Sequence, residues 1–303
     1  LRIERGQIDR AREVAARVSE PYALIGMRAD NRFASLTANG FSPADVKKAA
    51  IRMIDETRAA ALASPRSLKA LQSFTFYMLK SRQYRKVLAM TDAVLARVAA
   101  ASGGEAPYDD ISELIWIMNH RAEALQGLNR WNEAVDQMTR AARRPEKGDV
   151  NVSQKINLAS LLLKMGRPKE ALATISELGI LTPYGRMQVE SIHHEAGLYL
   201  KDSKMANEAM RYLREHTDDA PGAYEGALER SGDLDAAAAR LIARLSDPES
   251  RTETLVELQE YKETPAPPAV IKERRRSRSV RARADVRAAV AKVGRIEHYD
   301  LEP

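Results

Sequence analysis

The sequence predicts an all-α protein, and three observations support this prediction. Apolar residues recur at helical spacing in several long stretches, while no alternation typical of a strand is sustained. Alanine is abundant and aromatic residues make up only 5% of the chain, a composition that favours closely packed helices. The third observation is a recurring pattern of a tight turn, an acid and an alanine that opens an apolar stripe. The pattern is found at residues 125–141, 165–175, 204–213 and 231–241.

The recurring pattern returns at nearly regular intervals. Equivalent positions are separated by 47, 37, 38 and 28 residues. Repeats of about 20 to 50 residues are typical of solenoids, in which each helical hairpin packs on the next. Loop insertions account for the longer intervals, and a shortened first helix accounts for the last one. The equivalent positions are Val87, Ala134, Ala171, Ala209 and Ala237.

The first third of the chain carries clear helix signals. Residues 6–18 resemble the second half of a hairpin whose first half would lie before Leu1, so we expect the chain to be a trimmed form. A short helix is expected at residues 22–32. Ser42, Pro43 and Asp45 form a start signal, because serine caps free N–H groups, proline suits the first helical position and an acid favours the positive helix end. The expected helices that follow cover residues 43–62, 67–80 and 84–99.

The remaining helices are predicted from caps and breaks. Asp110 to Glu113 reads as a capping box at the start of a helix, and Ser153 is the expected cap of a helix at 154–164. A helix at 252–263 should end at the proline cluster 264–268, which favours an extended connection. A last amphipathic helix should cover the end of the array. Its apolar face is Val286, Val290 and Val293, and Gly294 ends it.

The chain divides into three predicted regions with different charge. Residues 1–65 form N-terminal helices, residues 66–247 form the repeats, and residues 248–303 form C-terminal helices with a proline-rich linker. The net charge is +6, of which residues 271–303 carry +5 (ten bases, five acids) and residues 1–270 carry +1 (38 bases, 37 acids). The body is therefore nearly neutral and the C-terminal segment is basic.

Composition narrows the possible functions. The chain has no cysteine, which excludes disulfides, thiolate metal sites and a cysteine nucleophile. No apolar run reaches 18 residues, so we expect no transmembrane segment. The lack of cysteine fits an exported bacterial protein and also fits many cytosolic ones. We slightly favour a periplasmic or exported location over the cytoplasm.

The sequence contains no motif for phosphate binding, nucleotide binding, metal binding or acyl transfer. His193 and His194 are adjacent and would point about 100° apart on a helix, which disfavours a shared metal. We expect one histidine to be packed and the other to lie at the surface or in a groove. Paired aspartates at 109–110 and 218–219 read as helix caps. We therefore expect no enzyme activity, no metal and no cofactor.

The repeats resemble those of a known family. A small residue, a large apolar residue three places later, a turn glycine and an alanine follow one another as in the tetratricopeptide repeat. The best match is Ala159, Leu162, Gly166 and Ala171. The resemblance covers roughly residues 67–246, and the repeats around Val87 and Ala237 look degenerate. The other two good matches are Gly197, Leu200, Ala209 and Ala122, Leu125, Ala134.

The resemblance to bacterial tetratricopeptide proteins implies a right-handed α-solenoid that binds a peptide or protein in its concave groove. Trp131 is expected to pack between the helices of its unit. For Trp116, a place in the groove and a place in the packing are equally expected. Asn119 and Asn157 lie near positions that grip chaperone C-termini in the family, but the matching lysines are incomplete and no such ligand is assigned. The implied groove residues are Lys69, Gln72, Phe76, Lys80, Trp116, Asn119, Glu123, Gln126, Asn157, Ser160, Lys164, His194, Leu198 and Lys201.

The basic C-terminal segment offers an alternative function. It would make the protein a polyanion-binding or envelope-associated adaptor, through nucleic acid, anionic lipid or an acidic protein patch. The simpler reading is a solvated helix, because the arginines would spread around all sides. No aromatic is interleaved for base stacking, so nucleic acid is not the expected partner. The bases concerned are Lys272, Arg274, Arg275, Arg276, Arg278, Arg281 and Arg283.

Overall fold

The computed structural model describes residues 7–37, 42–101, 106–146 and 148–302. These residues form seventeen α-helices, three short 3-10 helices and two strands of two residues each. The predicted all-α class is confirmed. The first residue of the predicted helix at 6–18 lies outside the described ranges.

Helix α4 begins at its predicted start signal, and α2 begins at a cap that was not predicted. The backbone N–H of Ser42 donates to the carboxylate of Asp45 at 2.8 Å, and this bond lowers the pKa of Asp45 to about 2. Glu20 caps the second helix by accepting from the backbone N–H of Ala23 at 2.6 Å. These helices are α1 (Ile8–Ala15), α2 (Pro21–Ala29), η1 (Asn31–Phe33), α3 (Ala34–Thr37) and α4 (Pro43–Ala63).

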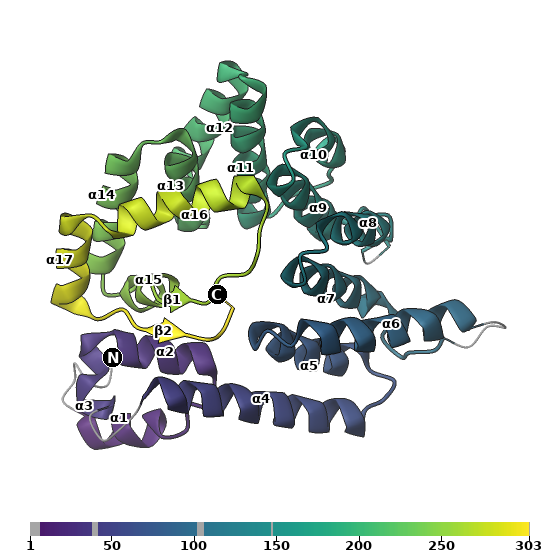
Figure 1. Ribbon diagram of the computed structural model, residues 1–303, viewed down its shortest axis with the longest axis horizontal. Coiled ribbons are helices and arrows are strands. Elements are labelled where there is room, and N and C mark those ends of the chain that lie inside the picture. The colour runs from purple at the N-terminus through teal and green to yellow at the C-terminus, as the bar shows by residue number, and fades with distance from the viewer. Residues whose placement is uncertain (1–6, 38–41, 102–105, 147, 303) are drawn as a thin grey trace.

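The next helices pack in consecutive antiparallel pairs that follow an arc (Figure 1). Each pair is joined by a tight turn, and each helix also contacts helices of the neighbouring pair. Two predicted caps are corrected. Asn151, two residues before the predicted Ser153, caps α9 by accepting from the N–H of Gln154 at 3.1 Å. The helices are α5 (Leu68–Lys80), α6 (Tyr84–Ala100), η2 (Ile111–Glu113), α7 (Leu114–Gly127), α8 (Trp131–Ala142), α9 (Val152–Lys164), α10 (Pro168–Ile175), α11 (Pro183–Leu200), α12 (Ser203–Glu215), η3 (Thr217–Asp219), α13 (Pro221–Ser231) and α14 (Leu234–Ser246).

Asp110 is the second corrected cap. Its carboxylate accepts from the backbone N–H groups of Leu68 at 2.6 Å and Lys69 at 2.9 Å, and from the hydroxyl of Ser67 at 2.9 Å. Asp110 does stand directly before η2, as predicted, but its side chain makes no cap bond there. It caps α5, which lies more than 40 residues earlier, instead. Sequence spacing alone could not indicate this partner, because the contact is made between two helical pairs.

Small residues set the close approach of paired helices. Ala122, Ala134, Ala159 and Ala171 are fully buried in the largest core cluster. At Gly197, an added Cβ would lie only 2.8 Å from the backbone nitrogen of Ala206 on the paired helix. The small residues that suggested the repeat pattern therefore lie at helix–helix contacts.

We expect Gly197→Ala to lower the free energy of unfolding by about 1 to 2 kcal/mol, because the methyl group forces apart two backbones that cannot easily move. Alanine is otherwise the better helix former by about 1 kcal/mol. Gly222→Ala is the matched control, since no atom lies within 4 Å of a Cβ at that helical glycine. Urea denaturation should show a loss for Gly197→Ala and no loss for Gly222→Ala; equal behaviour would contradict the close-approach argument.

The C-terminal region folds back onto the beginning of the chain. Helix α15 packs on α2, and β1 pairs in parallel with β2. Arg28 of α2 forms an ion pair with Glu297, with Nη2 and Oε1 2.6 Å apart. The backbone N–H of Glu302 donates to the carbonyl of Lys80 at 2.9 Å. The elements are α15 (Arg251–Glu257), β1 (Glu260–Tyr261), α16 (Pro268–Arg281), α17 (Ala284–Val293) and β2 (His298–Tyr299).

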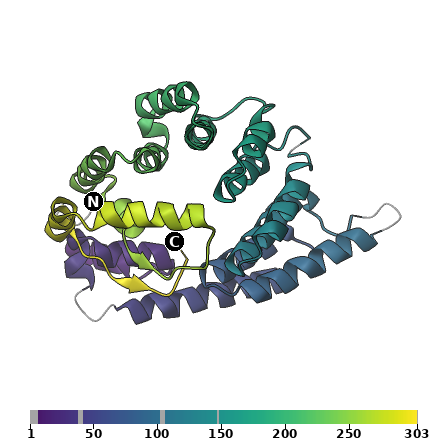
Figure 2. The same ribbon diagram turned by 45° about the horizontal axis from the view of Figure 1, so that its top comes forward.

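This return closes the arc and places α16 inside it (Figures 1 and 2). The predicted helix at 252–263 is wrong in its second half, because residues 260–261 pair with β2. The predicted last helix and its stop at Gly294 are confirmed, and Val286 and Val290 are buried. A Cβ at position 294 would lie 2.2 Å from the carbonyl oxygen of Ala29, so glycine permits the contact between the two ends.

Candidate binding groove

The inner face of the arc is hollowed by two adjoining cavities of about 270 Å³ and 770 Å³. Lys164 of α9 and Val270 of α16 line both of them. We call the two cavities together the inner groove. Its walls are the inner-facing ends of α5, α7, α9, α11 and α13 on one side and the N-terminal half of α16 on the other.

The smaller cavity brings together five of the predicted groove residues. Lys80 lies at its centre, and its ammonium group is 5.7 Å from the ring centroids of both Phe76 and Tyr22. The C-terminal Glu302 completes this end of the groove and accepts from Arg82 at 3.1 Å. The predicted residues that line the cavity are Phe76, Lys80, Glu123, Gln126 and Lys164.

Burial shifts the pKa values of the charged groups that line the smaller cavity. Burial raises the pKa of Glu123, and the charges of Lys80 and Lys164 oppose this shift. Burial likewise lowers the pKa of Lys80. The Glu123 side chain keeps surface open to the groove although protein surrounds it on most sides. A cation and an acid therefore both line the smaller cavity, where each can interact with the charge of a bound group.

Asn119 and Asn157 hold the Glu123 side chain through a chain of hydrogen bonds. The amide of Asn119 donates to the Glu123 carboxylate, and its oxygen accepts from the amide of Asn157 at 3.1 Å. Asn119 is buried, so its amide is used inside the protein. The two asparagines support the groove floor and do not line either cavity.

The larger cavity exposes apolar and aromatic side chains beside an ion-pair cluster. Leu198 and Tyr199 of α11 are 40% and 41% exposed. Arg230 of α13 lies between two acids, 3.7 Å from Glu195 and 2.9 Å from Glu273. Burial raises the pKa of Glu195. Leu198 was predicted for the groove, whereas Tyr199, Glu195 and Arg230 were not.

Several predicted groove residues lie elsewhere. His194 is a correction: it is buried, and its Nε2 lies 2.9 Å from the hydroxyl of Ser231. Lys201 ends α11 in a left-handed conformation with φ of 58°. Trp131 packs against the largest core cluster, as predicted, and also borders the smaller cavity. The predicted residues that line neither cavity are Lys69, Gln72, Trp116, Asn119, Asn157, Ser160, His194 and Lys201.

The groove residues that sequence reasoning missed come from the returning C-terminal region. Val270, Arg274 and Glu302 line the smaller cavity although they are far from α5 and α7 in the sequence. The repeat register carries no information about a segment outside the repeats. Only the proline cluster before α16 hinted that the chain changes direction there.

The basic segment is largely engaged within the protein. Arg274 donates to the carbonyl of Thr264 at 2.7 Å, and Arg276 donates to the carbonyl of Arg230 at 2.6 Å. Arg278 pairs with Glu263, and Arg283 pairs with Asp285 at 3.0 Å. Lys272 and Arg275 are exposed.

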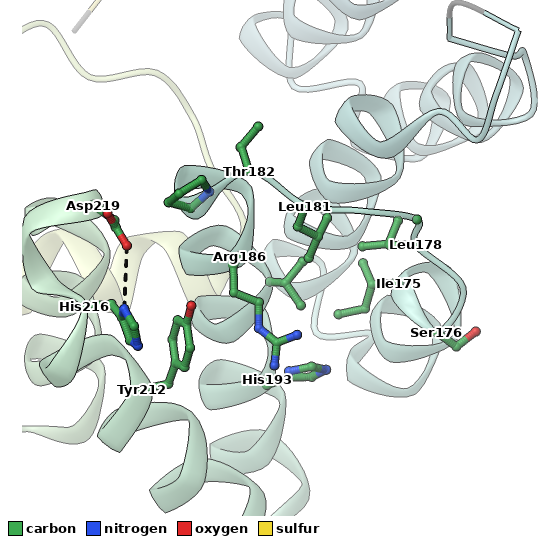
Figure 3. A pocket seen from close by; sticks show the side chains of 13 residues that line it. Ile175, Ser176, Leu178, Leu181, Thr182, Arg186, His193, Tyr212, His216 and Asp219 are labelled. Carbon is green, nitrogen blue, oxygen red and sulfur yellow. Dashed lines mark ion pairs between the residues drawn. The ribbon is translucent and has the colours of Figure 1, made fainter.

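A third cavity, of about 670 Å³, lies outside the groove between the α10–α11 connection and α12 (Figure 3). It opens because α10 has only 8 residues, whereas α8 and α12 have 12 and 13. Arg186 is paired with Glu190 at 2.6 Å and lies 5.4 Å from the ring centroid of Tyr212. His216 stacks on Tyr212 and pairs with Asp219. The charges of this cavity are thus largely balanced among its own side chains.

The adjacent histidines separate as predicted. His194 is packed, and His193 is half-exposed with its Nδ1 3.3 Å from Glu190. Among the described residues, no group of three or more potential ligands is placed to hold a metal ion. Within the same ranges, no helix combines the length and the apolar character needed to cross a membrane.

The fold and the groove define an all-α protein whose paired helices surround a partly filled inner surface. Comparisons with protein-family models, with curated proteins and with solved structures find no match to this chain.

Proposed function

We propose that the protein is a tetratricopeptide-like α-solenoid that acts as a non-catalytic scaffold and binds a peptide or protein segment in its inner groove. The observation that carries this proposal is the pair of adjoining cavities on the inner face. Each cavity has an exposed apolar or aromatic side chain in its wall: Phe76 in the smaller one, and Leu198 and Tyr199 in the larger one. Polypeptide segments are bound in this way, with pockets for side chains and polar groups for the backbone.

The chemistry of the groove suits a polypeptide ligand. Phe76 at one end and Tyr199 at the other are about two-fifths exposed and offer anchoring surfaces. Gln126 can bond a ligand backbone group, and Lys164, at the junction of the cavities, can meet a carboxylate. Aromatic side chains of this kind often contribute most of the binding energy at an interface.

Two tyrosines of α11 provide a matched test. Tyr199 lines the groove, whereas Tyr184 is 62% exposed and lines none of the three cavities described above. Peptides selected from a display library against the full chain should bind Tyr199→Ala about 30-fold more weakly, the effect of losing a binding hot spot of about 2 kcal/mol. Calorimetric titration should show unchanged affinity for Tyr184→Ala.

The proposal fails if the library yields no binder or if both tyrosine variants bind selected peptides as the unmodified chain does. Phe76→Ala, at the other end of the groove, extends the test. A ligand that spans both cavities should lose affinity in each groove variant, whereas a ligand held at one end should respond to one variant only.

A further inference from the structure

Helix α16 rests on the inner face of the arc in the position that a bound helix would take. It lies inside the curve in both ribbon views (Figures 1 and 2), and it contacts α13 and α14. Its residues Val270, Glu273 and Arg276 form part of the wall of the larger cavity. The chain therefore shows directly what kind of segment this surface accepts.

Adjacent residues of α13 hold one face of α16. Arg230 pairs with Glu273 at 2.9 Å, and its backbone carbonyl accepts from Arg276 at 2.6 Å. The neighbouring Glu229 accepts from the hydroxyl of Ser277. Residues 273, 276 and 277 are spaced by three and four, so they lie on one face of the helix. Glu229 and Arg230 thus contact an acid and, one turn later, a base and a hydroxyl.

The apolar burial of α16 is confined to its C-terminal end. Val280, near the C-terminal end, is the one buried residue of α16. The helix is preceded by the proline-rich connection 264–267, and its first two turns carry exposed Ile271, Lys272 and Arg275. Val280 belongs to the same core cluster as Val286 and Val290 of α17. The first turns of α16 are thus held mainly by hydrogen bonds and ion pairs. Such contacts contribute little to stability where water can reach them.

We propose that the inner face at α13 is a docking surface for a helical segment with an acid followed three and four residues later by arginine and serine, and that α16 is its resident occupant. A partner helix with this pattern binds by replacing residues 268–277 of α16. The inference rests on the proposed function and adds the chemistry of the partner. The ion pair between Arg230 and Glu273 indicates that the partner helix must carry an acid opposite Arg230.

A charge-swap experiment tests this with the full chain. The probe is a fluorescent synthetic peptide of residues 264–283, in its natural sequence or with Glu273→Arg. The Glu273→Arg protein should release its own helix, because Arg230 then faces a like charge, and should bind the natural peptide at least tenfold more tightly than the unmodified protein does. The Arg230→Glu protein should prefer the Glu273→Arg peptide at least tenfold over the natural one. Fluorescence anisotropy measures both affinities.

Trypsin provides an independent measure of release, because residues 274–283 contain six arginines. Cleavage there should be faster in both variant proteins than in the unmodified one, while circular dichroism reports that their helix content is retained. Control peptide with residues 273, 276 and 277 changed to alanine should bind none of the proteins.

Two results overturn the proposal: peptide affinities that do not follow the charge swap, or cleavage within α16 that is unchanged in both variants. If one variant protein loses helix content, the peptide affinities of the other variant protein decide the test. If display-selected peptides still depend on Tyr199 while the charge swap fails, the groove remains a binding site and only the identity of its occupant is wrong.

Discussion

Lowering the pH from 7 to 4 is expected to destabilise the fold strongly, because two histidines are buried in neutral form. His120 is 6% exposed and His194 is 1% exposed. Each ring is within hydrogen-bond distance of one hydroxyl: Nδ1 of His120 is 2.7 Å from Thr75, and Nε2 of His194 is 2.9 Å from Ser231. Burial lowers the pKa of each from 6.5 to about 4, and the charge of Arg230 adds to this effect at His194.

The direction follows from proton binding. Below pH 6.5 the unfolded chain takes up a proton at each of these histidines, whereas the folded chain does not until the pH approaches 4. Stability is therefore complete above pH 6.5 and is lost between pH 6.5 and 4. One pKa unit corresponds to about 1.4 kcal/mol, so each histidine removes about 3 kcal/mol over this range.

Substitutions can distinguish the contribution of the histidines to the pH dependence of stability from that of the acids. Burial raises the pKa of Glu123, Glu195 and Glu225, so their protonation in the folded state offsets part of the loss. His120→Gln and His194→Gln should each flatten the fall in urea-derived stability between pH 6.5 and 4.5. The same change at exposed His298 is the control. A pH profile that no buried substitution alters would show that these histidines do not cause the acid sensitivity.

The sequence predicted most helix positions because their signals are local. Ser42, Pro43 and Asp45 mark the start of α4 through contacts among themselves, and Gly294 ends α17 as predicted. Phe76, Lys80 and Glu123, which the predicted repeat register placed together, line one cavity. Local signals and the predicted register could therefore predict residues on only one side of the groove.

The opposite side of the groove depends on contacts between distant segments. Glu302 binds Lys80 and Arg82 only because the chain closes on itself, and no periodic pattern encodes that closure. His194 was misplaced for a related reason. Repeat register gives the helix face on which a residue lies, but Ser231 of α13 covers that part of the face. Asp110 likewise caps a helix of another pair.

Replacing Arg244 by methionine should lower the free energy of unfolding by about 3 kcal/mol, since removing one member of a buried ion pair leaves a charge without compensation. The guanidinium of Arg244 joins three helices: it lies 2.9 Å from Glu225 of α13 and 2.9 Å from Glu257 of α15. The side chains of Arg244 and Glu225 are only 8% and 14% exposed. Glu257 is 47% exposed, so water compensates its charge and the loss should lie at the lower end for buried pairs.

A second substitution distinguishes lost charge compensation from lost packing. If the uncompensated carboxylate of Glu225 causes the loss, adding Glu225→Gln to Arg244→Met should recover part of the stability. Arg130→Met is the matched control, because Arg130 forms an exposed pair with Glu133 and should change stability by less than about 1 kcal/mol. Equal losses at positions 130 and 244 in urea denaturation would contradict the argument. Because α15 also packs on α2, loosening Arg244 should weaken the closure of the two chain ends as well, which would appear as faster amide exchange in β1 and β2.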